Sequence, residues 1–330
     1  MTGSGRTDPP VAIVILNWGH TAATLACLRS VERLDYPNRH IIVVDNESSE
    51  TSAKALAAVP NVTLVRNAAN LGFTGGVNTG IRHAMQGDAA YVWLLNNDAE
   101  PRPDTLRRLV AAAEADPLIG LASPVFHDPE DPNRVEFCLA RFDPLARVAS
   151  QTADPAEASA WQTQHPDQVV LLGTALLIRR ALIETIGGLD ERFFAYVEDV
   201  DYGLRCIAAG FRTVAVADAV VLHKFKQPTV QPDQCPPYLH YYMSRNYLLL
   251  WQKLPSPFLL HRASLWFFRQ RLVQITRMAG QPAAIDALLA GLWDGIRGIG
   301  GPFDPSRRMP WPLRQMLGRW PGLWLRLLER

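Results

Sequence analysis

The first residues that could do chemistry are Asn96, Asn97 and Asp98, which follow the apolar run Tyr91–Leu95. A carboxylate beside amide groups offers hard oxygen ligands, which suit Mg²⁺ and Mn²⁺, and these cations also bind phosphate. A single carboxylate holds such a cation weakly, so the substrate would supply the remaining ligands. The alternative interpretation is a turn before Glu100, because Asn and Asp side chains readily form turns.

A second acidic group stands at the start of a predicted helix and consists of Glu198, Asp199 and Asp201. It follows the aromatic stretch Phe193–Tyr196. Crowded carboxylates raise one another's pKa, and a carboxylate beside an apolar wall is suited to act as a general base. The alternative interpretation is structural, because negative charge stabilises a helix N-terminus and Asp201 can pair with Arg205 one turn later.

Two further residues are candidates for binding an anion or a metal. His223 closes an apolar run at a predicted strand end, where an imidazole can ligate a metal or contact phosphate. Most lone histidines are structural, which is the alternative interpretation. Arg245 follows a pair of tyrosines and could bind phosphate through two parallel hydrogen bonds. The alternative is an arginine on the solvent face of a helix.

The elements that must position these residues alternate in type along the first half of the chain. Apolar, β-branched runs predict buried strands, with helical spacing between them. The predicted strands are Val11–Leu16, His40–Asp45, Val62–Arg66, Tyr91–Leu95 and Ile119–Ser123. This alternation predicts an α/β fold with a doubly wound, mostly parallel sheet, in which ligands bind at the carboxyl ends of the strands.

Polar residues close four of these strands, which indicates a nucleotide-type site at this edge of the sheet. They are Asn17, Asp45, Arg66 with Asn67, and Asn96-Asn97-Asp98. The glycines at 72, 75 and 76 lack the Gly-x-Gly-x-x-Gly spacing of a dinucleotide site, and no Walker motif is present. Dinucleotide and ATP binding are therefore not favoured.

The second half is less regular. The proline-rich stretch 128–168 predicts a long loop or a weak β insertion, of the sort that carries function in a compact domain. Val169–Ile178 and Thr213–Val221 predict strands, and Tyr238–Trp251 and Leu265–Met278 predict helices.

Composition excludes several classes of protein. Hydrophobic residues make up 48% and charged residues 20%, which is typical of a globular chain. The four cysteines are too widely spaced for a disulfide scaffold or a cysteine zinc site, and they fit a reducing cytosol. The sequence contains no run of 18 uncharged apolar residues, so no membrane-spanning helix is expected. Residues 1–10 lack a signal-peptide pattern.

The C-terminal part differs in charge from the rest. Residues 240–330 hold 13 Lys and Arg against four Asp and Glu, and six of the nine tryptophans. Such a surface is expected to meet something anionic, and the leucines and tryptophan of 323–328 could lie on an anionic bilayer. The alternatives are a solvated basic face over an aromatic core, or a homodimer contact.

Taken together, the motifs resemble those of the family 2 inverting glycosyltransferases of GT-A fold. They are VAIVILNW, VVDNES, NLGFTGGVNTG, LLNND, IGGLDERFFAYVEDVDYGLR, VLH and YYMSRN, spread over residues 11–251. The nearest subgroup is that of bacterial rhamnosyltransferases of surface-polysaccharide assembly. The resemblance implies a nucleotide-sugar donor, a divalent cation and transfer by a single displacement with inversion.

The sequence patterns, together with the range of the resemblance, predict a domain plan. Residues 1–10 would be a flexible N-terminus. Residues 11–251 would form the GT-A domain, with a nucleotide-sugar half at 11–125 and an acceptor half at 169–251. Residues 252–330 would be a helical, basic, Trp-rich C-terminal region. The insertion at 128–168 lies between the two halves.

On the donor side, the resemblance assigns roles residue by residue. Asn17 matches a residue near the nucleotide, and Asp45 matches the aspartate that reads the edge of the pyrimidine base. Asn70, Gly72 and Gly76 match the loop that faces the ribose and the diphosphate.

At the reacting centre, Asn97 and Asp98 match the Asp-x-Asp-type metal motif. His223 matches a histidine that contacts the metal or the diphosphate. Asp199 matches the general base, with Glu198 beside it. Because the motif reads Asn-Asn-Asp here, Asp98 would hold Mg²⁺ or Mn²⁺ almost alone.

These expectations converge on a metal-dependent inverting glycosyltransferase located in the cytoplasm or at the inner face of the cell membrane. Its donor would be dTDP-rhamnose or, next, a UDP-sugar. Its acceptor would be a hydroxyl of a saccharide or a lipid-linked polysaccharide precursor, and no nucleic acid is expected as a partner. The alternative is a catalytically silent family member that binds a glycan or a partner protein. A nucleotidyltransferase would need a glycine-rich, basic loop where Asn17-Trp18-Gly19-His20 stands.

Overall fold

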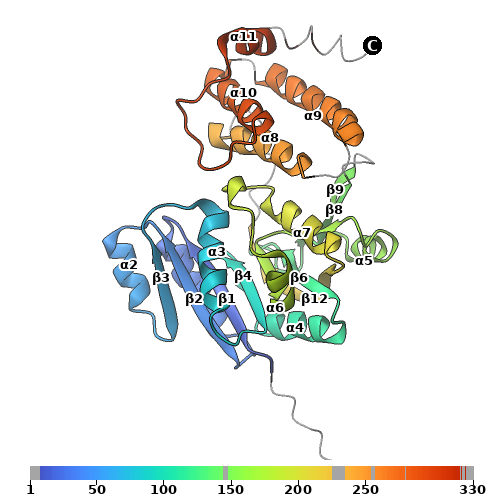
Figure 1. The fold of residues 1–330 in the computed structure, drawn as a ribbon. Coiled ribbons are helices and arrows are strands. Elements are labelled where there is room, and N and C mark those ends of the chain that lie inside the picture. Colours follow the sequence, from blue (N-terminus) through green and yellow to red (C-terminus); the bar gives the residue numbers. More distant parts are fainter. Residues whose placement is uncertain are drawn as a thin grey trace, which may run out of the picture. The chain divides into compact units, whose positions relative to one another are not determined.

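The computed structural model describes residues 8–143, 148–224, 235–253, 257–278, 280–319, 321 and 324. The chain forms two compact units (Figure 1). Unit 1 comprises Met1–Asp143, Ala149–Leu189 and Asp199–Phe225, and unit 2 comprises Pro144–Val148, Asp190–Glu198 and Lys226–Arg330. The sequence predicted a boundary after residue 251, whereas this division places helix α8 (Pro237–Trp251) with the C-terminal helices.

Unit 1 is built on a mixed sheet that has nine strands within the described residues, in the order β3-β2-β1-β4-β11-β6-β12-β5, with β7 beside β6. Strands β3, β2, β1 and β4 are parallel, as are β6 and β12, while β11 runs antiparallel to β4 and β6. The predicted α/β fold with a mostly parallel sheet is therefore confirmed. The strands are β1 (Val11–Asn17), β2 (Arg39–Asn46), β3 (Val62–Asn67), β4 (Tyr91–Asn96), β5 (Glu100–Pro101), β6 (Ile119–His127), β7 (Val135–Phe137), β11 (Ala175–Arg179) and β12 (Arg212–Leu222).

Helices cover both faces of this sheet, because side chains alternate along β1 and both faces are apolar. Val11, Ile13 and Ile15 pack in one buried cluster with side chains of α1 and α4. Ala12 and Val14 pack in a second cluster with side chains of α3, α6 and α7. These helices, with α2 beside β3, are α1 (Thr21–Glu32), α2 (Glu50–Ala57), α3 (Gly72–Ala84), α4 (Thr105–Ala115), α6 (Arg180–Ile186) and α7 (Glu198–Ala208).

Helix α3 approaches β1 closely because it presents glycines four residues apart (Figure 1). A β-carbon at Gly76 would collide with the Leu16 side chain, and one at Gly80 would collide with Val14. The glycines of this motif therefore serve helix-to-sheet packing, which brings the N-terminus of α3 to the carboxyl edge of the sheet.

The prediction of a single strand over Val169–Ile178 was wrong. Val169–Ile178 is not continuous: Val169–Val170 forms β10, which pairs with β8 (Leu139–Asp143), and Ala175–Arg179 forms β11 in the main sheet. The backbone N–H of Asn96 donates to the carbonyl of Thr174 at 2.8 Å, just where the chain enters the main sheet. The apolar run looks uniform in sequence because both short strands are buried.

The insertion at 128–168 contains more structure than a loop. Besides β7, it contains two strands of a second, three-stranded sheet and a helix that the sequence did not predict. The strands favour the β alternative over the long loop for this stretch. The elements are β8 (Leu139–Asp143), β9 (Val148–Thr152) and α5 (Pro155–Gln164).

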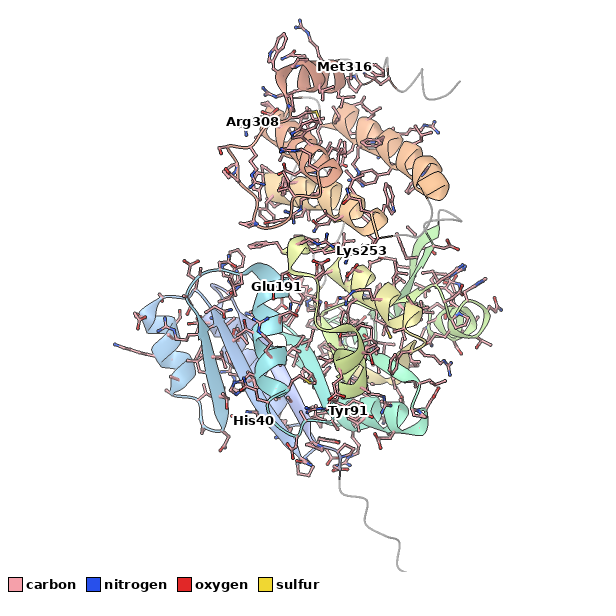
Figure 2. All side chains as sticks on the ribbon, viewed as in Figure 1. His40, Tyr91, Glu191, Lys253, Arg308 and Met316 are labelled. Atoms are coloured by element: carbon pink, nitrogen blue, oxygen red, sulfur yellow. The ribbon has the colours of Figure 1, made fainter. Side chains whose placement is uncertain are left out.

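Unit 2 is helical in its described part, as predicted. Its long helices are α8, α9 (Pro257–Arg277), α10 (Pro282–Ile296) and α11 (Trp311–Arg319). Helices α8 and α10 cross closely, because Gly291 lies against the backbone of Tyr241 and Gly295 lies against Leu248. Side chains of unit 2 appear in Figure 2, where the labelled Lys253 forms an ion pair with Asp190 at 2.7 Å.

The burial of the tryptophans in unit 2 distinguishes between the interpretations of the basic, Trp-rich C-terminal region. Trp251, Trp266, Trp293 and Trp324 pack in or against one buried cluster, which favours the aromatic-core interpretation for these four. Trp311 is exposed. The leucines of 323–328 lie outside the described residues. Within the described part, no helix combines the length and the apolar character needed to cross a membrane.

We expect Gly80→Ala to lower the free energy of unfolding by about 1–3 kcal/mol, because the added methyl overpacks the contact between α3 and β1. Gly87→Ala is the matched control, since a β-carbon there meets only the Ala84 carbonyl at 3.7 Å. Chemical denaturation of both variants measures the difference. Equal stability of the two variants would contradict the packing role of Gly80.

Candidate active site

Three predicted residues meet at the carboxyl ends of β1, β2 and β4. Asn17 and Asp45 are register partners, and Asn17 Nδ2 donates to Asp45 Oδ1 at 3.4 Å. Thr24 links the network: its hydroxyl donates to Asn17 Oδ1 at 2.7 Å and accepts from Asn97 Nδ2 at 3.0 Å. The sequence analysis missed Thr24. The sequence feature that could have identified Thr24 is a hydroxyl residue in the first turn of the helix that follows β1.

The carboxylate of Asp45 is buried and oriented by donors on three sides. Besides Asn17, its Oδ1 accepts from the backbone N–H of Ser48 at 3.1 Å, and its Oδ2 accepts from Arg66 Nε at 3.1 Å. Arg66 is about half exposed and also pairs with Glu50 at 2.9 Å. The edge therefore combines a buried carboxylate with a partly exposed guanidinium, which could contact a nucleotide.

Asn46 holds the loop that the sequence assigned to the donor, although the sequence analysis did not single it out. Its Nδ2 donates to Asn70 Oδ1 at 2.9 Å and to the Gly72 carbonyl at 3.0 Å, and its Oδ1 accepts from the Leu71 N–H at 3.1 Å. Gly72 has φ +70°, which favours glycine at the start of α3. Gly76 lies one turn inside the helix against β1. This packing explains why the residue is a glycine, and the explanation needs no contact with a ligand.

Asp98 and His223 are brought together by strand pairing. The short β5 pairs antiparallel with the end of β12, so the residues just outside both strands become neighbours. His223 Nε2 lies 3.3 Å from Asp98 Oδ1. The imidazole is buried, whereas the Asp98 side chain is 58% exposed and open to a ligand.

This pair fits a divalent cation that is shared with a substrate. An oxygen and an imidazole nitrogen are ligands for Mn²⁺, and the exposed carboxylate suits Mg²⁺ as well. Within the described residues, no group of three or more His, Cys, Asp or Glu side chains is arranged to hold a metal. The protein would therefore supply two ligands, and phosphate oxygens and water the rest.

Asp199 lies in the first turn of α7, beside the break in the predicted strand. Its Oδ2 accepts from the backbone N–H of Gly173 at 3.2 Å, and its Oδ1 accepts from the N–H of Val200 at 2.8 Å. Burial raises the pKa of the Asp199 carboxyl, against these two donors, which lower it. The raised pKa makes Asp199 a stronger base than an exposed aspartate.

Arg245 does not present its guanidinium to a phosphate in this structure, contrary to the sequence prediction. It is fully buried in unit 2, and its Nε donates to Asn246 Oδ1 at 2.8 Å. Its other N–H groups donate to the carbonyls of Arg192, Phe193 and Gly301 and to the Tyr241 hydroxyl. All five donors of the arginine are thus occupied.

The segment that Arg245 and Asn246 hold is strained. Phe194, Tyr196 and Val197 have φ values of 63°, 71° and 70°, a conformation that costs non-glycine residues about 1–3 kcal/mol each. Asn246 Nδ2 lies 3.0, 2.7 and 2.7 Å from the carbonyl oxygens of Phe193, Ala195 and Tyr196. We call Arg245 and Asn246 the α8 clamp. The clamped segment leads directly into Glu198, which is buried, and Asp199.

Comparison with known proteins places the chain in a family. It matches the family described as "Glycosyltransferase like family 2" over residues 9–234. The chain belongs to this family. The matched range contains every predicted site residue except Arg245, so the donor, metal and base assignments all lie in the family region.

Two curated relatives are rhamnosyltransferases by name. The chain is 32% identical over 203 residues to "N-acetylglucosaminyl-diphospho-decaprenol L-rhamnosyltransferase" of Mycobacterium tuberculosis (strain CDC 1551 / Oshkosh), covering 56% of this chain and 66% of that protein. It is 25% identical over 279 residues to "dTDP-rhamnosyl transferase RfbF" of Shigella flexneri, covering 82% of this chain and 90% of that protein. The first match spans slightly less than two thirds of the mycobacterial relative.

Solved structures agree on the fold. The "Mannosyltransferase PcManGT from Pyrobaculum calidifontis in complex with GDP-Man and Mn²⁺" superposes with a TM-score of 0.54 at 19% sequence identity. The superposition covers 98% of this chain and 85% of that one. This family member therefore has the GT-A fold that its motifs predicted.

The raised pKa of Asp199 predicts a dependence of stability on pH. Because the folded-state pKa lies above the unfolded value, the group contributes stability below the unfolded pKa, and that contribution is lost as the pH rises through the folded pKa. We therefore expect Asp199→Asn to unfold at a higher temperature than the wild type at pH 7, with a smaller difference at pH 4. Thermal unfolding at both pH values measures this.

The control is Asp201→Asn on the same helix. Asp201 forms an ion pair with Arg205 at 2.9 Å, so its substitution should lower the melting temperature at pH 7. If Asp199→Asn is destabilised like Asp201→Asn at pH 7, the attribution of the raised pKa to burial is wrong.

The α8 clamp predicts a large loss of stability on truncation. Asn246→Ala removes the donors to buried carbonyls, which should cost about 2–4 kcal/mol of unfolding free energy. Gln252→Ala, at the end of the same helix, removes a bond to the Gly295 carbonyl at 2.8 Å and should cost about 1 kcal/mol. Denaturant titration compares them, and equal losses would argue against the clamp.

Proposed function

We propose that this protein is a metal-dependent inverting glycosyltransferase that uses a pyrimidine-nucleotide sugar. The observation that carries the proposal is the Asp98–His223 pair, which lies in the same unit as the Asn17–Asp45–Asn97 network and the partly buried base Asp199. Membership of the glycosyltransferase-like family supports it.

The donor would lie along the carboxyl edge of the sheet. Asp45, with Arg66 and Asn17 around it, offers both hydrogen-bond donors and acceptors to a pyrimidine base. Asn70 and Gly72 would face the ribose and the diphosphate. Helix α3 begins at Gly72 and has no acidic residue in its first turn, so its N-terminal dipole favours an anion.

The names of the two relatives favour dTDP-rhamnose as the donor sugar, with a UDP-sugar as the next choice. The Shigella relative is named for dTDP-rhamnosyl transfer, and the mycobacterial one for L-rhamnosyl transfer. The side chains that surround the donor sugar decide between them.

The cation would be held by Asp98 and His223, with Asn97 beside them. When bound, a divalent cation neutralises the negative charge that develops on the leaving diphosphate. The exposed Asp98 carboxylate and the buried imidazole set its position on the sheet edge. The Pyrobaculum mannosyltransferase structure contains Mn²⁺ together with GDP-Man, which supports a shared metal and donor site; Mg²⁺ is the alternative metal.

Asp199 would accept the proton of the acceptor hydroxyl as that oxygen attacks the anomeric carbon from the face opposite the diphosphate. Burial raises its pKa towards the working pH, which strengthens it as a general base. The N–H groups of Gly173 and Val200 orient the carboxylate. Glu198, beside it at the helix start, adds negative charge. A single displacement needs no covalent intermediate on the protein.

The acceptor would be a saccharide, and a lipid-linked one is favoured by the diphospho-decaprenol in the name of the mycobacterial relative. The basic residues of 240–330 and the exposed Leu265 and Trp311 would suit the anionic inner face of the membrane as a peripheral contact. A homodimer contact through the same region is the alternative.

One observation favours the silent scaffold as a second candidate. The Asn-Asn-Asp sequence leaves a single carboxylate at the metal position, and the protein supplies two ligands in the described part. Absence of donor binding in the presence of either metal would support this candidate.

The test is donor titration with dTDP-rhamnose, UDP-glucose, UDP-galactose and UDP-N-acetylglucosamine, each with and without Mn²⁺ or Mg²⁺. We expect metal-dependent binding of one donor and slow donor hydrolysis. Asp199→Asn should keep donor binding and lose about 10²–10⁴-fold in rate, the usual contribution of a general base. Asp98→Asn should lose the metal dependence of binding.

The control is Asp35→Asn, because Asp35 pairs with Arg107 on the surface, before β2 begins. It should bind and hydrolyse the donor as the wild type does. If no donor binds in the presence of either metal, the proposed reaction is wrong and the scaffold is favoured.

A further inference from the structure

Four aromatic rings gather in unit 2 around the clamped segment, and we call them the tyrosine cluster: Phe194, Tyr196, Tyr238 and Tyr242. Tyr242 is its centre. The ring of Phe194 stacks on it at 5.7 Å with an interplanar angle of 12°, and the rings of Tyr196 and Tyr238 lie 6.1 and 6.5 Å away. The cluster combines residues that are more than 40 positions apart in the sequence.

The cluster has a buried base and an exposed rim. Tyr242 is buried, and its hydroxyl accepts from the backbone N–H of Phe303 at 2.8 Å. Tyr196 and Tyr238 are 39% and 44% exposed, and their side chains are hydrogen-bonded to each other. Two tyrosine rings are thus fixed on a rigid support while part of each ring stays accessible.

The backbone is held in an unfavourable conformation at this rim. Tyr196 and Val197 have positive φ, and Asn246 of the α8 clamp binds the Tyr196 carbonyl at 2.7 Å. Strained residues persist only where the surroundings impose them, and they gather at functional sites. Burying an aromatic ring does not explain the strain at Tyr196, because that ring remains exposed.

The chemistry of the rim fits a neutral sugar. The face of an aromatic ring carries partial negative charge, which attracts the C–H groups on the flat side of a pyranose, and the phenol hydroxyls can bond sugar hydroxyls. The negative charge of Glu198 acts on Tyr196, which disfavours a phosphate at this position. A bare lipid chain would offer no hydrogen-bonding group to the hydroxyls of Tyr196 and Tyr238.

We propose that Tyr196 and Tyr238 bind the acceptor saccharide of this protein by stacking on its sugar ring. The inference rests on the proposed glycosyl transfer and adds the place where the acceptor binds. Tyr196 is three residues before Asp199 in the chain. The role of the α8 clamp in this inference is to fix the Tyr196 ring that stacks on the acceptor.

The experiment compares Tyr238→Ala, Tyr238→Phe and the control Ile296→Ala. Ile296 is an apolar residue of the same unit, 51% exposed and outside the cluster. The acceptor probes are the hexyl glycosides of rhamnose, galactose and N-acetylglucosamine and the diphosphate-linked N-acetylglucosamine with a short alkyl chain. The readouts are the acceptor KM at saturating donor and the donor Kd without acceptor.

We expect Tyr238→Ala to raise the acceptor KM about tenfold, the effect of losing one ring contact, while the donor Kd keeps its wild-type value. Tyr238→Phe keeps the ring and should raise the KM less. Ile296→Ala should change neither quantity. Circular dichroism checks that each variant is folded.

Three results would overturn the inference while leaving the proposed reaction intact. The first is an acceptor KM in Tyr238→Ala equal to that of Ile296→Ala. The second is a raised donor Kd with an unchanged acceptor KM, which would assign the rings to the nucleobase. The third is a wild type that binds the donor but none of the saccharide probes. A wild type that binds no donor would instead overturn the proposed function.

Discussion

The in-register pairing of parallel strands is the constraint on which the donor side depends. Asn17 is paired with Asp45, and Leu16 with Asn96, so β1, β2 and β4 end at the same level of the sheet. A shift by one residue would turn each of these side chains to the other face. Because β1 is apolar on both faces and helices cover both, hydrophobic alternation does not set this register, and the packing of particular side chains against the covering helices must do so. The close packing of α3 against Leu16 and Val14 then brings the Gly72 turn to the same edge.

The rest of the candidate site depends on interruptions of regular structure. The break at Leu171–Thr174 exposes the N–H of Gly173 to Asp199, and a continuous strand would use that group in the sheet. The short β5 ends the sheet beside β12 and thereby joins Asp98 to His223. In unit 2, the strain at Phe194, Tyr196 and Val197 is offset by the buried Arg245 and Asn246. The candidate site residues thus lie where the chain departs from helix or strand, and the regular helices and strands around them hold these irregular segments in place.

The same burial that makes Asp199 useful makes it unfavourable for folding. A carboxylate taken out of water resists ionisation, and two backbone N–H groups compensate only in part. Asp201, two residues later, is more deeply buried than Asp199 but has Arg205 as its partner. Two carboxylates on one helix therefore differ in role because one is paired and the other is directed at a backbone N–H. Their spacing in the sequence is compatible with either assignment.

The sequence by itself determined the alternation of strands and helices and the polar ends of the strands. It also identified the residues that the family motifs assign to the donor, the metal and the general base. These are local properties: hydrophobic period, β-branched content and turn residues decide them without reference to distant contacts. Several site details depended on neighbours far along the chain. The tertiary structure divided Val169–Ile178 into two strands, gave Gly76 a packing role and buried Arg245 against carbonyls of the segment before Glu198. It also revealed Thr24, Asn46 and Asn246, whose partners lie 7, 24 and about 50 residues away. A hydrogen-bond donor in a sequence is compatible with many acceptors, and only folding decides which acceptor lies within reach.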